Sequence, residues 1–179
     1  MAVPEAYADL WSKDRDAQHD SFTALFAETE TPVDWAYEVW DDVVDHLASP
    51  DNHDRSIAAQ LLCRLAASDP QGRLRTDLPR LLAVTHDERF VTARHALQSL
   101  WYVGALGGWR RDAVLKALES RFESCAGEKN CTLIRFDIVV VLKRMTDESG
   151  DPVPSELAAR LALSEPDPKY RKKYEAALR

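Results

Sequence analysis

Cysteine is scarce in this sequence, and the few cysteines present follow no functional spacing. There are three, Cys63, Cys125 and Cys131. An odd number with no CxxC pair and no Cys/His ligand spacing argues against both a disulfide framework and a zinc site. We therefore predict three plain thiols. A local bridge between Cys125 and Cys131, across a turn, is the alternative.

Long apolar runs and glycine are also scarce. No window approaches the roughly 18 uncharged apolar residues that a membrane-spanning helix requires. The first residues lack the basic region and apolar core of a signal peptide. We therefore expect a cytoplasmic protein that does not enter a membrane. Only 6 of the 179 residues are glycine, which favours a helical chain because turn-rich β-proteins contain more.

Basic residues are nearly absent from the first 54 positions. There, 14 acidic residues stand against only Lys13 and Arg15, whereas residues 55–179 carry 21 basic and 16 acidic residues. A charge asymmetry of this kind bears on partners and solubility rather than on the fold. An acidic N-terminal end would suit a basic protein partner.

Motifs of known catalytic chemistry are missing as well. The sequence has no nucleophile elbow, phosphate-binding loop, dinucleotide fingerprint or zinc-protease helix. Its richest polar cluster, WDDVVDHLASPDNHD, places Asp42 and His46 one helical turn apart, and a divalent metal site can be drawn there. A solvated helix face followed by helix-capping carboxylates is the favoured interpretation. We predict no catalytic residue, no metal and no cofactor, and a non-enzymatic protein rather than an enzyme.

What the sequence does contain is helical periodicity. The stretch LIRFDIVVVLKRM includes four consecutive β-branched residues, which by propensity suit a strand. However, Ile138, Val141, Leu142 and Met145 follow the spacing of one helical face. The propensity cost is a few tenths of a kcal/mol per β-branched residue, and burial easily offsets it. We predict a helix over residues 133–145.

Similar helical segments recur with a period. Arg55, Arg94, Arg135 and Arg171 lie 39, 41 and 36 residues apart, and core-type residues follow each arginine at offsets of three, six and seven. A period near 40 indicates stacked helical hairpins, because one hairpin cannot cover its apolar face alone.

The sequences around two of these arginines resemble the HEAT-repeat family. In that family the second helix of each hairpin opens with an aspartate and, a short gap later, an arginine, as do residues 51–55 and 167–171. The resemblance implies an all-α fold, an α-solenoid of about four HEAT-like helical hairpins over residues 31–179. Residues 1–30 would form an N-terminal helical cap within one structural domain.

The resemblance also implies a binding surface, since the second helices of HEAT repeats line a concave face. The residues next to the core stripe on these helices would meet a partner: Gln60, Arg64, His95, Gln98, Ser99, Tyr102, Phe136, Lys143 and Lys172. Phe136 has an alternative interpretation, packing on a neighbouring helix.

A Gly-Gly-Trp-Arg-Arg stretch provides a second candidate contact. Predicted as a loop, it would present Trp109 with Arg110 and Arg111 to a base or a protein. The alternative is that Trp109 folds back over the seam of a hairpin.

These features favour a protein–protein interaction module, an adaptor or an inhibitor or immunity-type binder that uses the concave face and the acidic cap. A subunit that holds the substrate of a modifying enzyme would look the same in sequence. The alternative is a nucleic-acid-binding protein related to the HEAT-like DNA glycosylases of alkylated bases. The phosphate-binding residues would then be Arg64, Arg94, Lys143, Arg144 and Lys172. The acidic cap and the small basic excess make nucleic acid the less favoured partner. The sequence does not indicate an oligomeric state.

Overall fold

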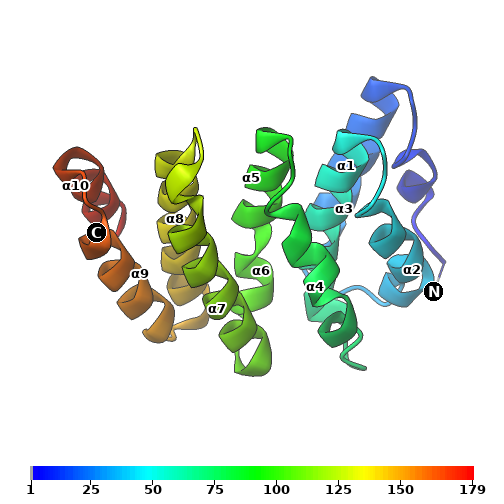
Figure 1. The fold of residues 1–179 in the computed structure, drawn as a ribbon. Helices are drawn as coiled ribbons and strands as arrows, with labels where there is room; N and C mark the ends of the chain where they lie inside the picture. The colour runs from blue at the N-terminus through cyan, green and yellow to red at the C-terminus, as the bar shows by residue number, and fades with distance from the viewer. Residues whose placement is uncertain (1) are drawn as a thin grey trace. The chain divides into compact units, whose positions relative to one another are not determined.

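The computed structural model describes residues 2–179, and this part of the chain contains helices and no β-strand (Figure 1). The all-α prediction is confirmed. The chain divides into two compact units, Met1–Ala96 and Leu97–Arg179, and the division falls inside helix α5. A predicted boundary after residue 30, between cap and repeats, stays a prediction.

None of the helices in the described residues combines the length and the apolar character that crossing a membrane requires.

The first unit is built around helix α3. In chain order its elements are η1 (Glu5–Asp9), α1 (Arg15–Glu28), α2 (Ala36–His46), α3 (Asn52–Leu65), η2 (Ala66–Ser68), α4 (Leu74–Val84) and the first part of α5 (Phe90–Ser99). Helix α3 packs against α1, α2 and α4, while α1 also packs on η1, and α2 contacts α4. Each helix therefore covers apolar surface of more than one neighbour.

Helix α2 is buried on two sides. Trp40, Val43 and Val44 are buried on it, and the Trp40 Nε1 donates a 2.9 Å hydrogen bond to the Asp77 carboxylate of α4. The N-terminal segment contacts two different helices. Trp11 stacks on the His46 ring of α2 with centroids 3.7 Å apart, whereas helix α1 lies against α3.

The second unit is built around helix α8. Its elements are the end of α5, α6 (Trp101–Gly104), α7 (Gly108–Ser124), η3 (Cys125–Gly127), α8 (Cys131–Ser149), α9 (Val153–Ser164) and α10 (Pro168–Ala177). Helix α8 contacts α6, α7, α9 and α10. It contains the stretch with four β-branched residues, and Ile138, Val141, Leu142 and Met145 are all buried. The predicted helix over residues 133–145 is confirmed, because burial outweighs the strand propensity.

The predicted Gly-Gly-Trp-Arg-Arg loop is wrong. Helix α7 begins at Gly108, so Trp109, Arg110 and Arg111 occupy its first turn. Gly107 and Gly108 have φ values of 76° and 55°, a conformation that glycine adopts without strain. The chain therefore turns at the two glycines and is already helical at Trp109.

Two of the four periodic arginines, Arg55 and Arg135, occupy equivalent places in the two units. Arg55, near the start of α3, makes two bonds of 2.6 and 2.9 Å to Asp87, which lies between α4 and α5, and donates to the Ser49 carbonyl at 2.8 Å. Arg135, near the start of α8, bonds Glu165, between α9 and α10, at 2.9 Å and the Phe122 carbonyl at 3.0 Å. Each arginine thus ties its helix to the preceding helix or turn and to a carboxylate in the connection between the next two helices.

Two of the three cysteines are paired. Cys125 and Cys131 form a disulfide across the turn between α7 and α8, and Cys63 is a buried free thiol. The prediction of three plain thiols is wrong for this pair, and the alternative of a local bridge is confirmed. The turn brings the two Cα atoms to 5.1 Å, within the range that a disulfide spans.

Thiol counting tests this bridge. Alkylation of the denatured, unreduced protein should label Cys63 alone, and prior reduction should raise the count to all 3 cysteines, as measured by intact mass. A Cys125→Ser control should add one labelled thiol without reduction, because it releases Cys131. Labelling of every cysteine in the purified, unreduced protein would contradict the pairing.

Candidate binding groove

A groove of about 430 Å³ lies in the first unit where helices α1, α3 and α5 come together. Its volume is within the range of sites that take a ligand or part of one. We call it the α1–α3–α5 groove. It is lined by Arg15, Gln18, His19, Phe22, Asn52, His53, Ser56, Ile57, Gln60, Val91, Thr92 and His95.

The floor of the groove is buried and held by hydrogen bonds. Gln18 on α1 donates from its Nε2 to the Leu10 carbonyl and to Asp54 on α3, both at 3.1 Å. Thr92 on α5 donates from its hydroxyl to the Asn52 carbonyl at 3.1 Å. These bonds connect α1 and α5 to α3, so the floor of the groove is preorganised by hydrogen bonds within the chain.

The rim combines apolar and imidazole side chains that face solvent. Val91, in the first turn of α5, is 61% exposed although it is a large apolar residue. Phe22 is half-buried, and His19 and His53 are exposed. Apolar atoms beside hydrogen-bonding groups in a hollow are the usual composition of a binding site.

One wall carries two residues of the predicted concave face. The Gln60 Nε2 donates to the carbonyl and the hydroxyl of Ser56 at 3.1 and 3.2 Å. The Ser56 Oγ lies 2.9 Å from the His95 Nδ1. Gln60 on α3 and His95 on α5 therefore meet through Ser56, and both line the groove.

Arg15 connects α1 to the start of α3 by hydrogen bonds. Its Nη1 donates to the Gln18 Oε1 and its Nη2 to the Asp51 Oδ2, each at 2.7 Å. Asp51 also caps α3 by accepting from the His53 N–H at 2.8 Å. The hydrogen bond from Arg15, with the capping bond, lowers the pKa of Asp51 to about 2. Asp51 is therefore ionised at neutral pH and already engaged within the chain.

No aspartate or glutamate lines this groove. Residues 1–96 nevertheless include 18 acidic and only 9 basic residues. Several of these carboxylates bind cations of the same unit, among them Glu30, whose Oε1 accepts from Arg64 at 2.8 Å. The acidic excess of the N-terminal end is thus partly neutralised inside the fold, and Asp51 and Asp54 are bonded to Arg15 and Gln18 of the groove lining.

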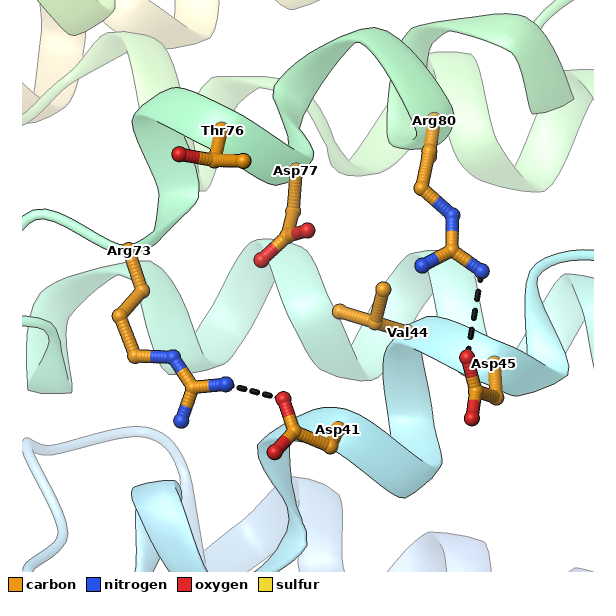
Figure 2. Close-up of a pocket in the computed structure, with 7 residues that line it drawn as sticks. All are labelled: Asp41, Val44, Asp45, Arg73, Thr76, Asp77 and Arg80. Carbon is orange, nitrogen blue, oxygen red and sulfur yellow. Dashed lines mark hydrogen bonds and ion pairs between the residues drawn. The ribbon is translucent and has the colours of Figure 1, made fainter.

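A second hollow, of about 410 Å³, shows this pairing directly. It lies between α2 and α4 and is lined by Asp41, Val44, Asp45, Arg73, Thr76, Asp77 and Arg80. Figure 2 shows Arg80 on α4 reaching Asp45 on α2, at 3.3 Å, and Arg73, the N-cap residue of α4, reaching Asp41 on α2. Asp77 accepts from Trp40, as described above. Because its charged groups bind one another, we interpret this hollow as a brace between two helices.

The acidic cluster around Asp42 also has a structural role. The Asp42 carboxylate accepts hydrogen bonds from the Tyr7 hydroxyl at 2.5 Å and the Trp11 Nε1 at 2.7 Å. His46 lies with its Nδ1 2.8 Å from the Asp42 carbonyl. In the described part of the chain no three His, Cys, Asp or Glu side chains are placed to share a metal ion. Asp42 therefore anchors the N-terminal segment on α2.

The other predicted binding residues lie outside the groove. Arg64 donates to the Phe26 carbonyl at 3.0 Å and so ties α3 to α1. In the second unit, Gln98 donates to Asp137 at 3.1 Å, and Lys143 pairs with Asp147 at 2.6 Å. Both are thus engaged within the chain.

Aromatic members of the predicted set pack on neighbours. Tyr102 lies against Trp101 with ring centroids 3.7 Å apart, and the Lys173 ammonium sits 4.2 Å from the centroid of Phe136. Phe136 is half-buried and contacts α10 through Lys173. Ser99 is buried, and Lys172 is exposed on α10. Cys63 is fully buried in α3.

Sequence reasoning missed the contribution of α1 to the groove. Arg15, Gln18, His19 and Phe22 share one helical face, and this spacing was the available signal. Their meeting with Val91 depends on how α1 packs on α3, which the spacing does not specify. No protein-family model, curated protein or solved structure matches the chain.

Proposed function

We propose that this chain is a non-enzymatic, HEAT-like α-solenoid protein that binds another protein through the α1–α3–α5 groove. Two features support the repeat architecture. Helices two apart in the chain pack together in each unit, as α2 does with α4 and α8 with α10. Arg55 and Arg135, separated by two repeats, make equivalent pairs of contacts. Stacked hairpins produce both features.

Val91 is the observation that carries the binding proposal. A side chain of its size at 61% exposure, in a hollow with Phe22 and Ile57, exposes apolar surface that a partner would cover. Hydrogen-bonding groups such as Gln60 and His95 surround this surface. An apolar centre with a polar rim is the composition of protein interfaces.

Nucleic acid remains the weaker candidate. Of the residues suggested for phosphate contacts, Arg64 pairs with Glu30, Lys143 with Asp147, and Arg144 lies 3.8 Å from Glu148 and over the ring of Trp101. Groups engaged in this way are less available to phosphate. The acidic excess of the first unit adds repulsion. No contact in the structure specifically favours the nucleic-acid alternative.

A display experiment tests the protein-binding proposal. Short random peptides displayed on phage are selected on the full chain, and enriched peptides are measured by fluorescence polarisation. Val91→Asp should weaken their binding at least about tenfold, because it buries a charge against apolar groups. Leu163→Asp is the matched control, since Leu163 is 62% exposed in the other unit. Peptides that bind Val91→Asp and Leu163→Asp equally well would contradict binding at the groove.

A further inference from the structure

The first and last α-helices of the chain carry outward sides of opposite charge. Helix α1 packs on α3 in the first unit, and α10 packs on α8 and α9 in the second. We infer that the outward side of α10 binds the outward side of α1 on a second copy of this chain, so that copies associate head to tail. This inference goes beyond the proposed function, and none of the residues that carry it lines the α1–α3–α5 groove.

The outward side of α10 is basic. Lys169, Lys172 and Lys173 are exposed, and the second and third lie three and four residues after the first, which places all of them on one side of the helix. The inward side carries Tyr174, which is fully buried and donates to the Thr132 carbonyl of α8 at 2.8 Å. Throughout residues 2–179, no carboxylate forms an ion pair with these three lysines. We call the three lysines the basic face.

The outward side of α1 is acidic. Asp16 and Asp20 are exposed one turn apart, and Glu28 is exposed two turns further along. The inward side carries Gln18 and Leu25, both buried. In the part of the chain that the structure describes, no cation forms an ion pair with the three carboxylates. We call these carboxylates the acidic face.

The cations nearest to the acidic face are engaged within the chain. Lys13 and Arg15 both pair with Asp51, at 3.7 and 2.7 Å. Residues 1–30 include 7 acidic residues against these 2 basic ones. The cations of this end thus bind the start of α3, and the acidic face keeps its charge.

The carboxylates nearest to the basic face leave it positive. Glu165 is buried and pairs with Arg135 at 2.9 Å. Asp167 caps α10 by accepting from the Lys169 N–H at 2.8 Å, and Glu175 is half-buried. Residues 165–179 include 5 basic and 3 acidic residues, so the segment as a whole carries a positive excess.

Charge complementarity selects the arrangement of the two copies. Two basic faces repel each other, as do two acidic faces, whereas a basic face and an acidic face attract. The helices are of similar length, about 21 Å for α1 and about 15 Å for α10, so their charges can lie side by side. Ala24 on α1 and Ala176 on α10 are exposed beside these charges and are short enough to allow close approach. The basic partner that suits the acidic N-terminal end is then another copy of the same chain.

A contact between two different faces leaves each bound copy with one face still open. Such a heterologous contact produces a chain or a ring of copies rather than a symmetric dimer. Exposed ion pairs are individually weak, so we expect association only at protein concentrations of about 0.1–1 mM. Salt screens exposed charges, so the association should disappear at high ionic strength.

Sedimentation velocity of the full chain tests this contact. The weight-average mass should rise with concentration at about 20 mM salt and stay that of a monomer at about 500 mM. Lys169→Glu/Lys172→Glu should weaken the association at least about tenfold, because attraction becomes repulsion. Lys116→Glu/Lys129→Glu is the matched control, since it changes the net charge equally at two other exposed lysines of the second unit. The control should retain most of the association.

An exchange of charges identifies the faces that meet. Asp16→Lys/Asp20→Lys alone should also lose association. A mixture of this variant with Lys169→Glu/Lys172→Glu should regain it, because each reversed face then meets a face of opposite sign. Both variants are still negatively charged overall, so general attraction does not account for such a regain. The regain also shows that both variants are folded.

The contact between copies would be overturned by a wild type that stays monomeric at about 1 mM and low salt. A control that loses as much association as Lys169→Glu/Lys172→Glu would assign the effect to net charge and not to the basic face. A mixture of the two reversed variants that stays monomeric would contradict the pairing of α10 with α1. Association that disappears after nuclease treatment would assign the basic face to nucleic acid instead.

Discussion

Replacing Trp40 by alanine should lower the free energy of unfolding by about 4 kcal/mol, the scale observed when a large aromatic side chain is removed from a core. Trp40 is completely buried on α2, and its Nε1 donates to Asp77 on α4 at 2.9 Å. The substitution leaves a cavity and deprives a carboxylate of a donor. Both losses affect the contact between α2 and α4, so we expect the packing of these two helices to be weakened most.

Urea unfolding followed by circular dichroism measures this cost without depending on tryptophan emission. Trp40→Phe is the informative comparison, since it retains most of the apolar volume and removes the N–H. We expect it to cost about 1–3 kcal/mol, the range for losing a hydrogen bond to a charged group together with a small volume change. An alanine variant that loses less than about 1 kcal/mol would show that the contact between α2 and α4 tolerates the cavity.

Periodicity predicted the helices well because burial follows it. In α8, the buried residues Ile138, Val141 and Leu142 lie at the spacing of one helical face, and this spacing is visible in the sequence despite four β-branched residues. The start of α7 was not predictable in the same way. Whether Gly107 and Gly108 form a long loop or a tight turn depends on their φ angles, and glycine permits many.

The candidate site was predicted less completely, for a geometric reason. Gln60 and His95 were found because both lie on helices aligned by the arginine register. Phe22 joins them only through the packing of α1 on α3, which links residues far apart in the chain, whereas Val91 lies one turn before His95 on α5.

Arg55→Met should cost about 3 kcal/mol, near the lower end of the range for breaking a buried ion pair. The Asp87 side chain is only 7% exposed, and Arg55 contributes two bonds to it as well as one to the Ser49 carbonyl. Methionine retains apolar contact but leaves the carboxylate without its guanidinium. Arg89→Met is the matched control. Arg89 is largely exposed, its contact with Glu88 is 3.8 Å, and exposed pairs contribute under about 1 kcal/mol.

The pH dependence of the free energy of unfolding separates the contribution of the Arg55–Asp87 ion pair from that of side-chain packing. Hydrogen bonding to Arg55 lowers the pKa of Asp87 in the folded protein. A carboxylate whose pKa is lowered by folding stabilises the fold fully above its unfolded value, near 3.9, and loses that contribution as the pH falls through the lowered value. The difference in unfolding free energy between the wild type and Arg55→Met should therefore shrink in strong acid. A difference that stays constant with pH would assign the loss to packing alone.

If the arginines hold equivalent places in stacked repeats, Arg135→Met should destabilise the second unit to a similar extent. A negligible effect there would argue against the repeat architecture, because Arg135 and Glu165 are the counterparts of Arg55 and Asp87.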